Sequence, residues 1–212
     1  MINKLSDLYV ITTEISELNR AHTDVAEAAL KGGAKIIQYR EKNKSAEDIV
    51  KQAKQIKILC REYGAIFIVN DHPELAKEVD ADGLHLGQND QDIVKARIMF
   101  PEKIIGLSAT NLAEAIQAQS LGANYIGAGP IFETPTKTDA APPFGLEVLS
   151  QIAKAVSVPI VAIGGINMSN AAATLAAGAD ALAVISAIAN EKDMVRAAQQ
   201  FSGVTDESVA AS

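Results

Sequence analysis

The stretch Ile36-Ile37-Gln38-Tyr39-Arg40-Glu41-Lys42 places a short aliphatic run directly before an amide, a guanidinium, a carboxylate and an ammonium group. Two other stretches have the same layout: Ile66-Phe67-Ile68-Val69-Asn70-Asp71 and Leu84-His85-Leu86-Gly87-Gln88-Asn89-Asp90. Barrel and open α/β enzymes build their active sites from polar side chains at the carboxyl ends of buried strands. The pattern therefore predicts an α/β protein with its site at one end of the strands.

Eight short, largely apolar segments are candidates for buried parallel strands: 8–12, 35–39, 66–69, 83–86, 104–107, 125–128, 160–163 and 181–185. Helical patterns lie between them. Ser45 is placed to cap a helix that ends near Tyr63, and Asn111 to cap a helix over 112–121, with Glu114 at the capping-box position. Ser169 or Asn167 is placed to open a helix ending near 177.

A weak internal repeat supports this division, because Gly33, Gly122 and Gly178 each stand between a helical segment and the next strand. Glycine there terminates a helix in the left-handed conformation. Eight strand–helix units in 212 residues predict a single (β/α)8 TIM barrel over residues 1–202, followed by a flexible polar tail at 203–212. A doubly wound open sheet is the alternative.

Composition limits the classes of function. The hydrophobic content of 48% suits one compact domain with a full core, and the net charge of −7 disfavours nucleic-acid binding. Cys60 is the single cysteine, so no internal disulfide can form, and its helical setting predicts core packing. The absence of a signal-peptide pattern and of an 18-residue apolar span predicts a soluble, cytoplasmic protein without membrane partners. Whether it forms a homo-oligomer is left open.

The first candidate binding cluster is Gln38, Arg40 and Lys42, whose i, i+2, i+4 spacing on an extended segment directs all three to one side. Arginine offers a planar fork for phosphate oxygens and lysine a movable charge. Glu41 alternates away and is expected to pair with a neighbour. A solvated loop with a salt bridge is the alternative.

The second cluster contains Asp71 and Asp90, which follow what would be neighbouring barrel strands. Two carboxylates with room for water and substrate phosphate oxygens predict a Mg²⁺ site, with Asn70 beside it to bind polar ligand atoms. For each aspartate taken alone, a helix N-cap is the competing interpretation. His85 lies within a strand and is expected to be a hydrogen-bonded core or wall residue.

A third cluster comprises the long 129–144 loop and the last two strands. Thr134, Thr136 and Lys137 can hold a phosphate or carboxylate, or else belong to a solvated, proline-stiffened loop. The ends of the last two strands are marked by Gly164-Gly165 and Ile185-Ser186, where many barrels bind a phosphate monoester through backbone N–H groups. Together the clusters predict two anion sites, suited to joining two phosphorylated small molecules with loss of diphosphate.

These residues resemble the thiamine phosphate synthase family from about Leu8 to Phe201. The matching stretches are Gln38 to Lys42, Asn70-Asp71, His85 to Asp90, 127–132, Thr134-Pro135-Thr136-Lys137 and 162–166. The resemblance implies a transferase that joins 4-amino-2-methyl-5-hydroxymethylpyrimidine diphosphate to a thiazole phosphate, through a pyrimidine methylene cation formed when the C–O bond breaks.

The resemblance also implies roles for individual residues. Gln38, Arg40, Lys42 and Asn70 would bind the pyrimidine diphosphate, and Asp71 and Asp90 would bind Mg²⁺. Ser108 and Lys137 would also meet that substrate, and Arg40, Lys42, Ser108 and Lys137 are the catalytic candidates. Thr134, Thr136, Gly165, Ile185 and Ser186 would contact the thiazole phosphate. The matching stretches add Tyr39, Glu41 and Pro135 to the substrate-binding candidates.

Two positions depart from the family pattern: Thr13 stands where an acidic residue is common, and Thr110 where histidine is common. Two rival functions remain at this stage. A related thiazole tautomerase would need the thiazole phosphate site but not the metal pair and the diphosphate cations. A non-catalytic barrel that binds phosphorylated ligands is the other.

Overall fold

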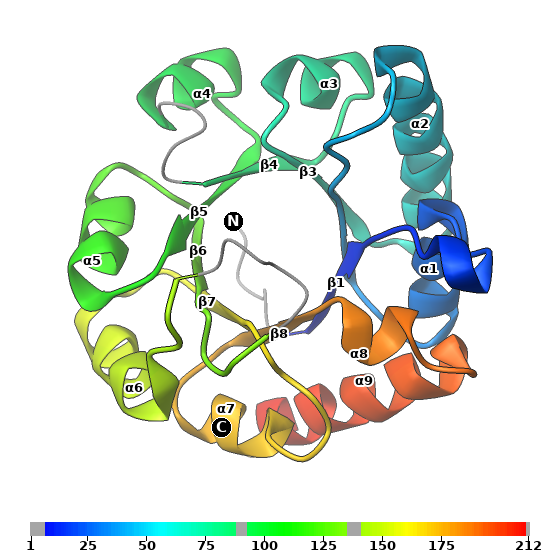
Figure 1. Ribbon diagram of the computed structural model, residues 1–212. Helices are drawn as coiled ribbons and strands as arrows, with labels where there is room; N and C mark the ends of the chain where they lie inside the picture. The colour runs from blue at the N-terminus through cyan, green and yellow to red at the C-terminus, as the bar shows by residue number, and fades with distance from the viewer. Residues whose placement is uncertain (1–6, 88–92, 135–140, 211–212) are drawn as a thin grey trace.

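The strands form a closed, all-parallel barrel in sequence order, with the helices around it (Figure 1). The structure is a computed structural model that describes residues 7–87, 93–134 and 141–210. Within these residues the strands are β1 (Leu8–Thr12), β2 (Ile36–Tyr39), β3 (Ile66–Asn70), β4 (Gly83–Leu86), β5 (Ile104–Ala109), β6 (Tyr125–Ala128), β7 (Ile160–Ile163) and β8 (Ala181–Val184). The pairing of β1 with β8 closes the barrel, so the (β/α)8 prediction is confirmed and the open sheet is excluded.

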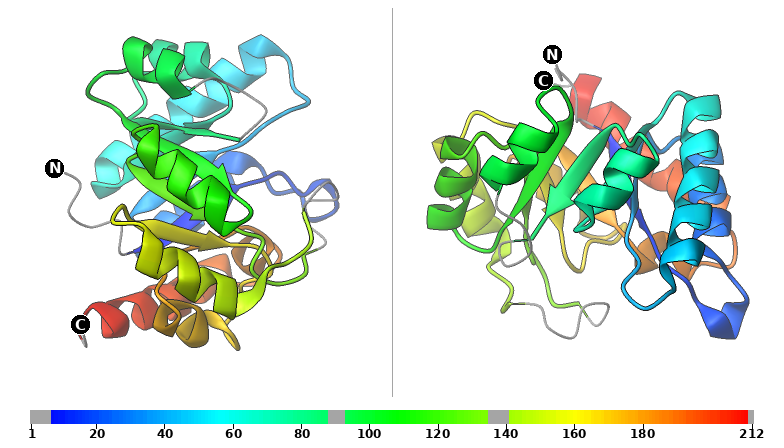
Figure 2. Two further views of the ribbon diagram at one scale, coloured as in Figure 1. Left: turned by 90° about the vertical axis from the view of Figure 1, so that its left-hand side faces the viewer. Right: turned by 90° about the horizontal axis from the view of Figure 1, so that it is seen from above.

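The helices form a single layer outside the strands, as two further views show (Figure 2). They are α1 (His22–Lys31), α2 (Ala46–Tyr63), α3 (Pro73–Glu78), α4 (Ile93–Met99), α5 (Leu112–Ser120), α6 (Gly145–Ala155), α7 (Ala171–Ala176), α8 (Ser186–Ala189) and α9 (Met194–Ala210), with a short 3-10 turn at Ser16–Leu18. Among the described helices none is long and apolar enough to span a bilayer.

Two of the predicted helix caps are present. The Ser45 hydroxyl accepts a hydrogen bond from the Asp48 N–H at 3.2 Å, and the Asn111 side chain accepts one from the Glu114 N–H at 2.9 Å. The Glu114 carboxylate reaches Thr110, whose N–H and hydroxyl both donate to it. The helix expected to open at Ser169 or Asn167 instead begins after Asn170, whose side-chain oxygen accepts from the Asn167 N–H.

Successive side chains of each strand point to opposite faces of the barrel, which divides the core into two clusters. The larger cluster lies between barrel and helices and includes Tyr39, Phe67 and Cys60. The smaller one fills the barrel interior with Tyr9, Ile11, Ile36, Ile68, Ile104, Tyr125, Val161, Ala181 and Ala183. Cys60 is fully buried, as expected for core packing, and burial raises the pKa of its thiol to about 12.

The C-terminal segment differs from the sequence prediction. Residues 203–210 continue α9 and are helical, where a polar tail is expected from the composition. Phe201 and Thr205 are buried, and the Thr205 hydroxyl donates to the carbonyl of Ser202 at 2.9 Å. The helix α9 packs against α1 and α7, which are distant in sequence, so the local composition does not reveal its burial.

Candidate active site

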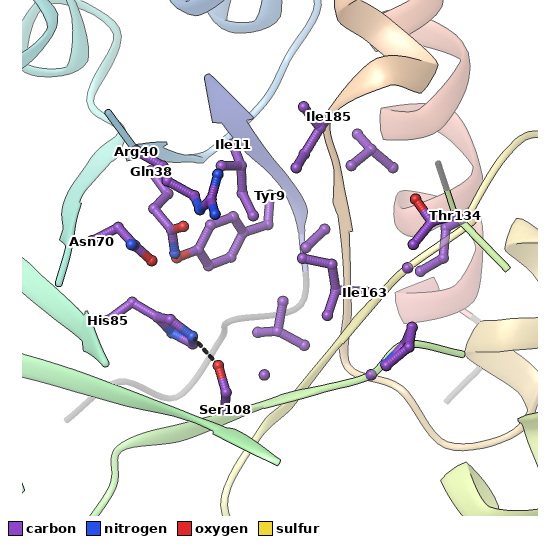
Figure 3. Close-up of a pocket in the computed structure, with 18 of the residues that line it drawn as sticks. Tyr9, Ile11, Gln38, Arg40, Asn70, His85, Ser108, Thr134, Ile163 and Ile185 are labelled. Atoms are coloured by element: carbon purple, nitrogen blue, oxygen red, sulfur yellow. Dashed lines mark hydrogen bonds between the residues drawn. The ribbon is translucent and has the colours of Figure 1, made fainter. Parts of the chain in front are cut away.

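A cavity of about 230 Å³ opens at the carboxyl end of the barrel. Most of the predicted site residues that the structure describes line it: Gln38, Arg40, Lys42, Asn70, Asp71, Ser108, Thr134, Gly165, Ile185 and Ser186. Figure 3 shows Gln38, Arg40, Asn70 and His85 gathered on one side, with Ile163, Ile185 and Thr134 on the other. The predictions for Asp90, Pro135, Thr136 and Lys137 lie outside the described residues.

The end of β2 brings Gln38, Arg40 and Lys42 to the cavity, as their alternate spacing predicts. The Gln38 amide nitrogen donates to the Tyr9 hydroxyl at 2.7 Å, and the Lys42 ammonium lies 3.8 Å from the Asp71 carboxylate. No hydrogen bond or ion pair joins the Arg40 guanidinium to another described residue. Its donors are therefore available to an anion in the cavity.

Tyr39 and Glu41 alternate away from the cavity and are not among its lining residues. The Tyr39 ring is buried under α1 and α2, and its hydroxyl donates to the Gln52 side chain at 2.9 Å. The Glu41 carboxylate faces His22, with 3.2 Å between Oε2 and Nε2. The structure thus confirms the expected pairing of Glu41, and neither side chain lines the cavity.

The end of β3 supplies Asn70 and Asp71. Asn70 is 8% exposed, and its side chain makes no hydrogen bond to another described residue. Asp71 has a φ of +62°, a left-handed conformation that costs an L-residue about 1–2 kcal/mol. Its N–H donates to the His85 carbonyl at 2.9 Å, which fixes the turn. Strained backbone of this kind is typical of functional sites.

A chain of hydrogen bonds crosses the cavity floor. The Tyr9 and Tyr125 hydroxyls lie 2.9 Å apart, and the Tyr125 hydroxyl is 2.8 Å from His85 Nδ1. His85 Nε2 is 3.0 Å from the Ser108 hydroxyl (Figure 3). Burial raises the pKa of both tyrosines well above the usual value, so both stay neutral. The chain fixes the Ser108 side chain at the cavity wall and confirms His85 as a hydrogen-bonded wall residue.

The opposite wall depends on two glycines with positive φ, Gly164 at +99° and Gly165 at +65°. A Cβ on Gly165 would lie 2.4 Å from the Glu133 carbonyl oxygen, and one on Gly164 would lie 2.6 Å from Pro130. The close approach is held by backbone bonds from Ile131 N–H to the Ile163 carbonyl and from Phe132 N–H to the Gly164 carbonyl. These bonds bring Thr134 to the same side of the cavity as Ile185 and Ser186.

The sequence pattern missed several lining residues. Tyr9, Ile11, Tyr125 and Val161 line the cavity from inside the barrel, and Thr110 lies at its rim. Tyrosine in an otherwise aliphatic strand was a usable signal, since a buried tyrosine needs a hydrogen-bond partner. The aliphatic positions carried no signal. A strand that is buried on both faces is apolar throughout, so its sequence does not show which residues face the cavity.

The donor chemistry at the cavity mouth suits Mg²⁺. Within the described part of the chain no group of three or more His, Cys, Asp or Glu side chains could hold a metal ion. The Asp71 carboxylate, 14% exposed, does face the cavity beside Lys42 and Asn70. Mg²⁺ is commonly bound through one or two carboxylates, with phosphate oxygens and water completing the shell. Asp71 therefore fits a metal that arrives with a phosphorylated substrate.

Comparisons with known proteins agree with this geometry. The family model described as thiamine monophosphate synthase matches residues 8–188. Thiamine-phosphate synthase of Chloroflexus aurantiacus is 49% identical over 92% of this chain and 90% of its own length, and that of Methanospirillum hungatei is 45% identical over 92% and 95%. The structure of thiamine phosphate pyrophosphorylase from Pyrococcus furiosus superposes with a TM-score of 0.89 at 40% identity, covering 96% of both chains.

Proposed function

The chain belongs to the thiamine monophosphate synthase family, and we propose that its cavity joins 4-amino-2-methyl-5-hydroxymethylpyrimidine diphosphate to a thiazole phosphate, giving thiamine phosphate and diphosphate. One observation carries the proposal. The Arg40 guanidinium faces the cavity near Asn70 (Figure 3) and has no protein partner among the described residues. Lys42 and Asp71 line the same cavity. A carboxylate beside two cations suits a diphosphate accompanied by a divalent ion.

The diphosphate half of the site promotes departure of the leaving group. As the pyrimidine C–O bond breaks, negative charge develops on the diphosphate, and Arg40 and Lys42 stabilise it. Gln38, Asn70 and Ser108 hold the polar atoms of the pyrimidine substrate. When bound, Mg²⁺ would neutralise further charge on the diphosphate, with Asp71 as a carboxylate ligand and Asp90 as the second one inferred from the family motif.

The apolar interior protects the methylene cation that remains. Ile11, Val161, Ile163 and Ala183 line the cavity between the two polar walls. They supply no nucleophile and restrict water, which would otherwise capture the cation and give an alcohol. The new C–N bond therefore forms with the thiazole nitrogen, the nucleophile that the site holds in place.

The glycine wall is proposed to hold the thiazole phosphate. Close backbone approach at Gly165, with Thr134, Ile185 and Ser186 on the same side of the cavity, offers N–H and hydroxyl donors for a phosphate monoester. Thr136 and Lys137 are proposed to add donors from the following loop. The reacting nitrogen would then lie between this wall and the diphosphate wall.

The experiment is incubation of the protein with both substrates and Mg²⁺, followed by measurement of thiamine phosphate and released diphosphate. Formation of both in equal amounts supports the synthase. A protein that converts the thiazole phosphate alone into an isomer, with no joined product, would instead be a tautomerase. Product formation that is unaffected by chelation of divalent ions would remove the metal role of Asp71 and Asp90.

A further inference from the structure

His22, a buried titratable residue outside the cavity, contacts the segment that carries the diphosphate cations. It is the first residue of α1 and is 1% exposed, and its ring packs edge-on against Tyr39 at 4.8 Å between centroids. His22 Nδ1 lies 2.8 Å from the Thr12 hydroxyl, and Nε2 lies 3.2 Å from Glu41 Oε2. One ring thus joins β1, α1 and the loop after β2. The helices α1 and α2 lie side by side over this region (Figure 1).

The Glu41 carboxylate in turn holds the backbone at Lys42 and Asn43. Its Oε1 accepts the Lys42 N–H at 2.6 Å and the Asn43 N–H at 2.7 Å, while Oε2 faces His22. Arg40 and Lys42 flank Glu41 and both line the cavity, whereas Glu41 does not. Holding the Glu41 side chain against α1 therefore holds its two neighbours toward the cavity. The direction of the two cations therefore depends on a carboxylate that does not line the cavity.

The donor directions follow from chemistry. An ionised carboxylate only accepts hydrogen bonds, so His22 Nε2 must carry a proton and donate to Glu41. Burial lowers the pKa of His22, against a smaller upward effect of Glu41, so the ring is neutral near pH 7. Nδ1 then accepts from the Thr12 hydroxyl. Hydrogen bonds thus run from Thr12 to His22 and from His22 to Glu41. Each ring nitrogen has one partner, and the ring is held in a single tautomer.

We propose that His22 is a positioning residue for the diphosphate site, which acts by holding Glu41 and thereby directing Arg40 and Lys42 into the cavity. The inference rests on the proposed function. A second contact braces the same loop, where Lys44 lies 2.8 Å from Glu14, but both side chains are 30% exposed. Exposed pairs contribute little, so the buried His22 contact is the one that sets the geometry.

The test compares His22→Leu, which removes the donor at similar size, with His22→Gln, whose amide nitrogen can restore a donor to Glu41. We measure the affinity for inorganic pyrophosphate with Mg²⁺ by calorimetry, and KM for each substrate. His22→Leu is expected to weaken pyrophosphate binding and kcat/KM for the pyrimidine diphosphate by about 10- to 100-fold, the cost of displaced binding groups, while KM for the thiazole phosphate is unchanged. His22→Gln should recover most of the loss.

Asp24→Ala is the matched control. The Asp24 carboxylate caps the same helix by accepting the Ala21 N–H at 2.8 Å, without touching Glu41. It should lower Tm and leave pyrophosphate affinity as in the wild type. Equal losses of affinity in Asp24→Ala and His22→Leu would reduce His22 to a structural role and overturn the proposal. So would normal affinity in His22→Leu.

Thr12→Val keeps the proposal testable if His22→Leu does not fold. It preserves shape and removes the hydroxyl that fixes the tautomer, which also lies 3.3 Å from the Gln38 carbonyl oxygen. A smaller loss of pyrophosphate affinity in the same direction is expected. Unchanged affinity in Thr12→Val when His22→Leu is unfolded would count against the proposal. Failure of the proposed function shows differently, because the wild-type protein itself would then form no thiamine phosphate.

Discussion

At the amino-terminal end of the barrel, side-chain oxygens accept hydrogen bonds from backbone N–H groups, whereas at the carboxyl end comparable polar groups face a cavity. Asp82, Asn124 and Asp180 stand directly before β4, β6 and β8, and their side chains accept the N–H groups of Phe67, Ile105 and Ile160, all at 2.8 Å. The three N–H donors belong to β3, β5 and β7. The same side-chain contact, made three times around the barrel, satisfies backbone donors that the sheet leaves unpaired.

The carboxyl end shows the opposite arrangement. Arg40 and the Asn70 side chain have no hydrogen-bond partner among the described residues, and Asp71 is held at positive φ. Polar groups of this kind add little to stability until a ligand binds them. Substitutions at the two ends of the barrel should therefore separate stability from activity.

The largest effect is expected for Arg40→Ala. It removes a charge that stabilises the leaving diphosphate, so kcat/KM should fall about 100- to 1,000-fold. Tm should stay close to that of the wild type, because the guanidinium has no partner among the described residues to lose. Steady-state kinetics and calorimetric melting measure the two quantities, with Arg40→Lys as a control of intermediate activity. A large fall in Tm would make Arg40 structural and break the comparison.

Asp71→Gly should separate stability from activity most clearly. Loss of the carboxylate should reduce turnover about 100-fold in saturating Mg²⁺. Glycine relieves the left-handed conformation but costs about 0.5–1 kcal/mol of chain entropy, so the free energy of unfolding should change by less than about 1 kcal/mol. Urea titration measures the stability. Activity close to the wild-type value would exclude Asp71 from the metal site.

Gly165→Ala and Gly64→Ala form a matched pair across the barrel, since both glycines have a φ of +65°. At Gly64, at the end of α2, a Cβ meets nothing within 4 Å, so the substitution reports backbone strain alone, about 1–2 kcal/mol. At Gly165 the Cβ also collides with the Glu133 carbonyl and displaces the proposed phosphate cradle. We expect KM for the thiazole phosphate to rise about tenfold or more only in Gly165→Ala. Equal KM values in the two variants would remove Gly165 from that site.

Asn124→Ala is the converse test at the amino-terminal end. Its Oδ1 accepts both the Ile105 N–H and the Arg97 guanidinium, at 2.8 and 2.6 Å. Arg97 keeps the Lys103 and Gly122 carbonyls as acceptors, so the Ile105 N–H is the donor that is left unpaired. Leaving it unpaired should cost about 1–3 kcal/mol of unfolding free energy, with kcat/KM unchanged. Asn124→Asp keeps the acceptor and should retain most of the stability. A loss of activity in folded Asn124→Ala would show that the two ends are coupled.

The sequence predicted the strands and the residues at their carboxyl ends well, and it predicted contacts between elements poorly. Four strands, including 83–86 and 160–163, coincide with the observed ones, because glycine, aspartate or proline bounds each aliphatic run. Gln38, Arg40 and Lys42 were placed correctly by alternation alone. The contact of His22 with Glu41 and the helical end of α9 depend on which helix packs on which strand. Local periodicity does not contain that information.

The smallest expected effect concerns acid stability and the loop that holds Arg40. Burial lowers the pKa of His22 below its usual 6.5. Burial pushes the pKa of Glu41 upward, but hydrogen bonds from Asn43, His22 and Lys42 outweigh it, so that pKa lies below 4.5. In both cases the unfolded chain binds a proton before the folded protein does, so stability falls as pH falls, first below 6.5 through His22 and then below 4.5 through Glu41.

We therefore expect Tm of the wild type to decline between pH 7 and pH 4.5, and His22→Leu to decline by a few degrees less over the same range. His72→Gln is the matched control, because His72 is exposed and its substitution should leave the decline in place. Calorimetric melting at each pH gives the slopes, which can be compared even if His22→Leu has a lower Tm throughout. An identical decline in His22→Leu and wild type would mean that His22 takes up its proton equally in the folded and unfolded chains. The assignment of His22 as a neutral ring that donates to Glu41 would then be wrong. The loop after β2 would no longer differ from the amino-terminal end of the barrel in being held by a side chain of a surrounding helix.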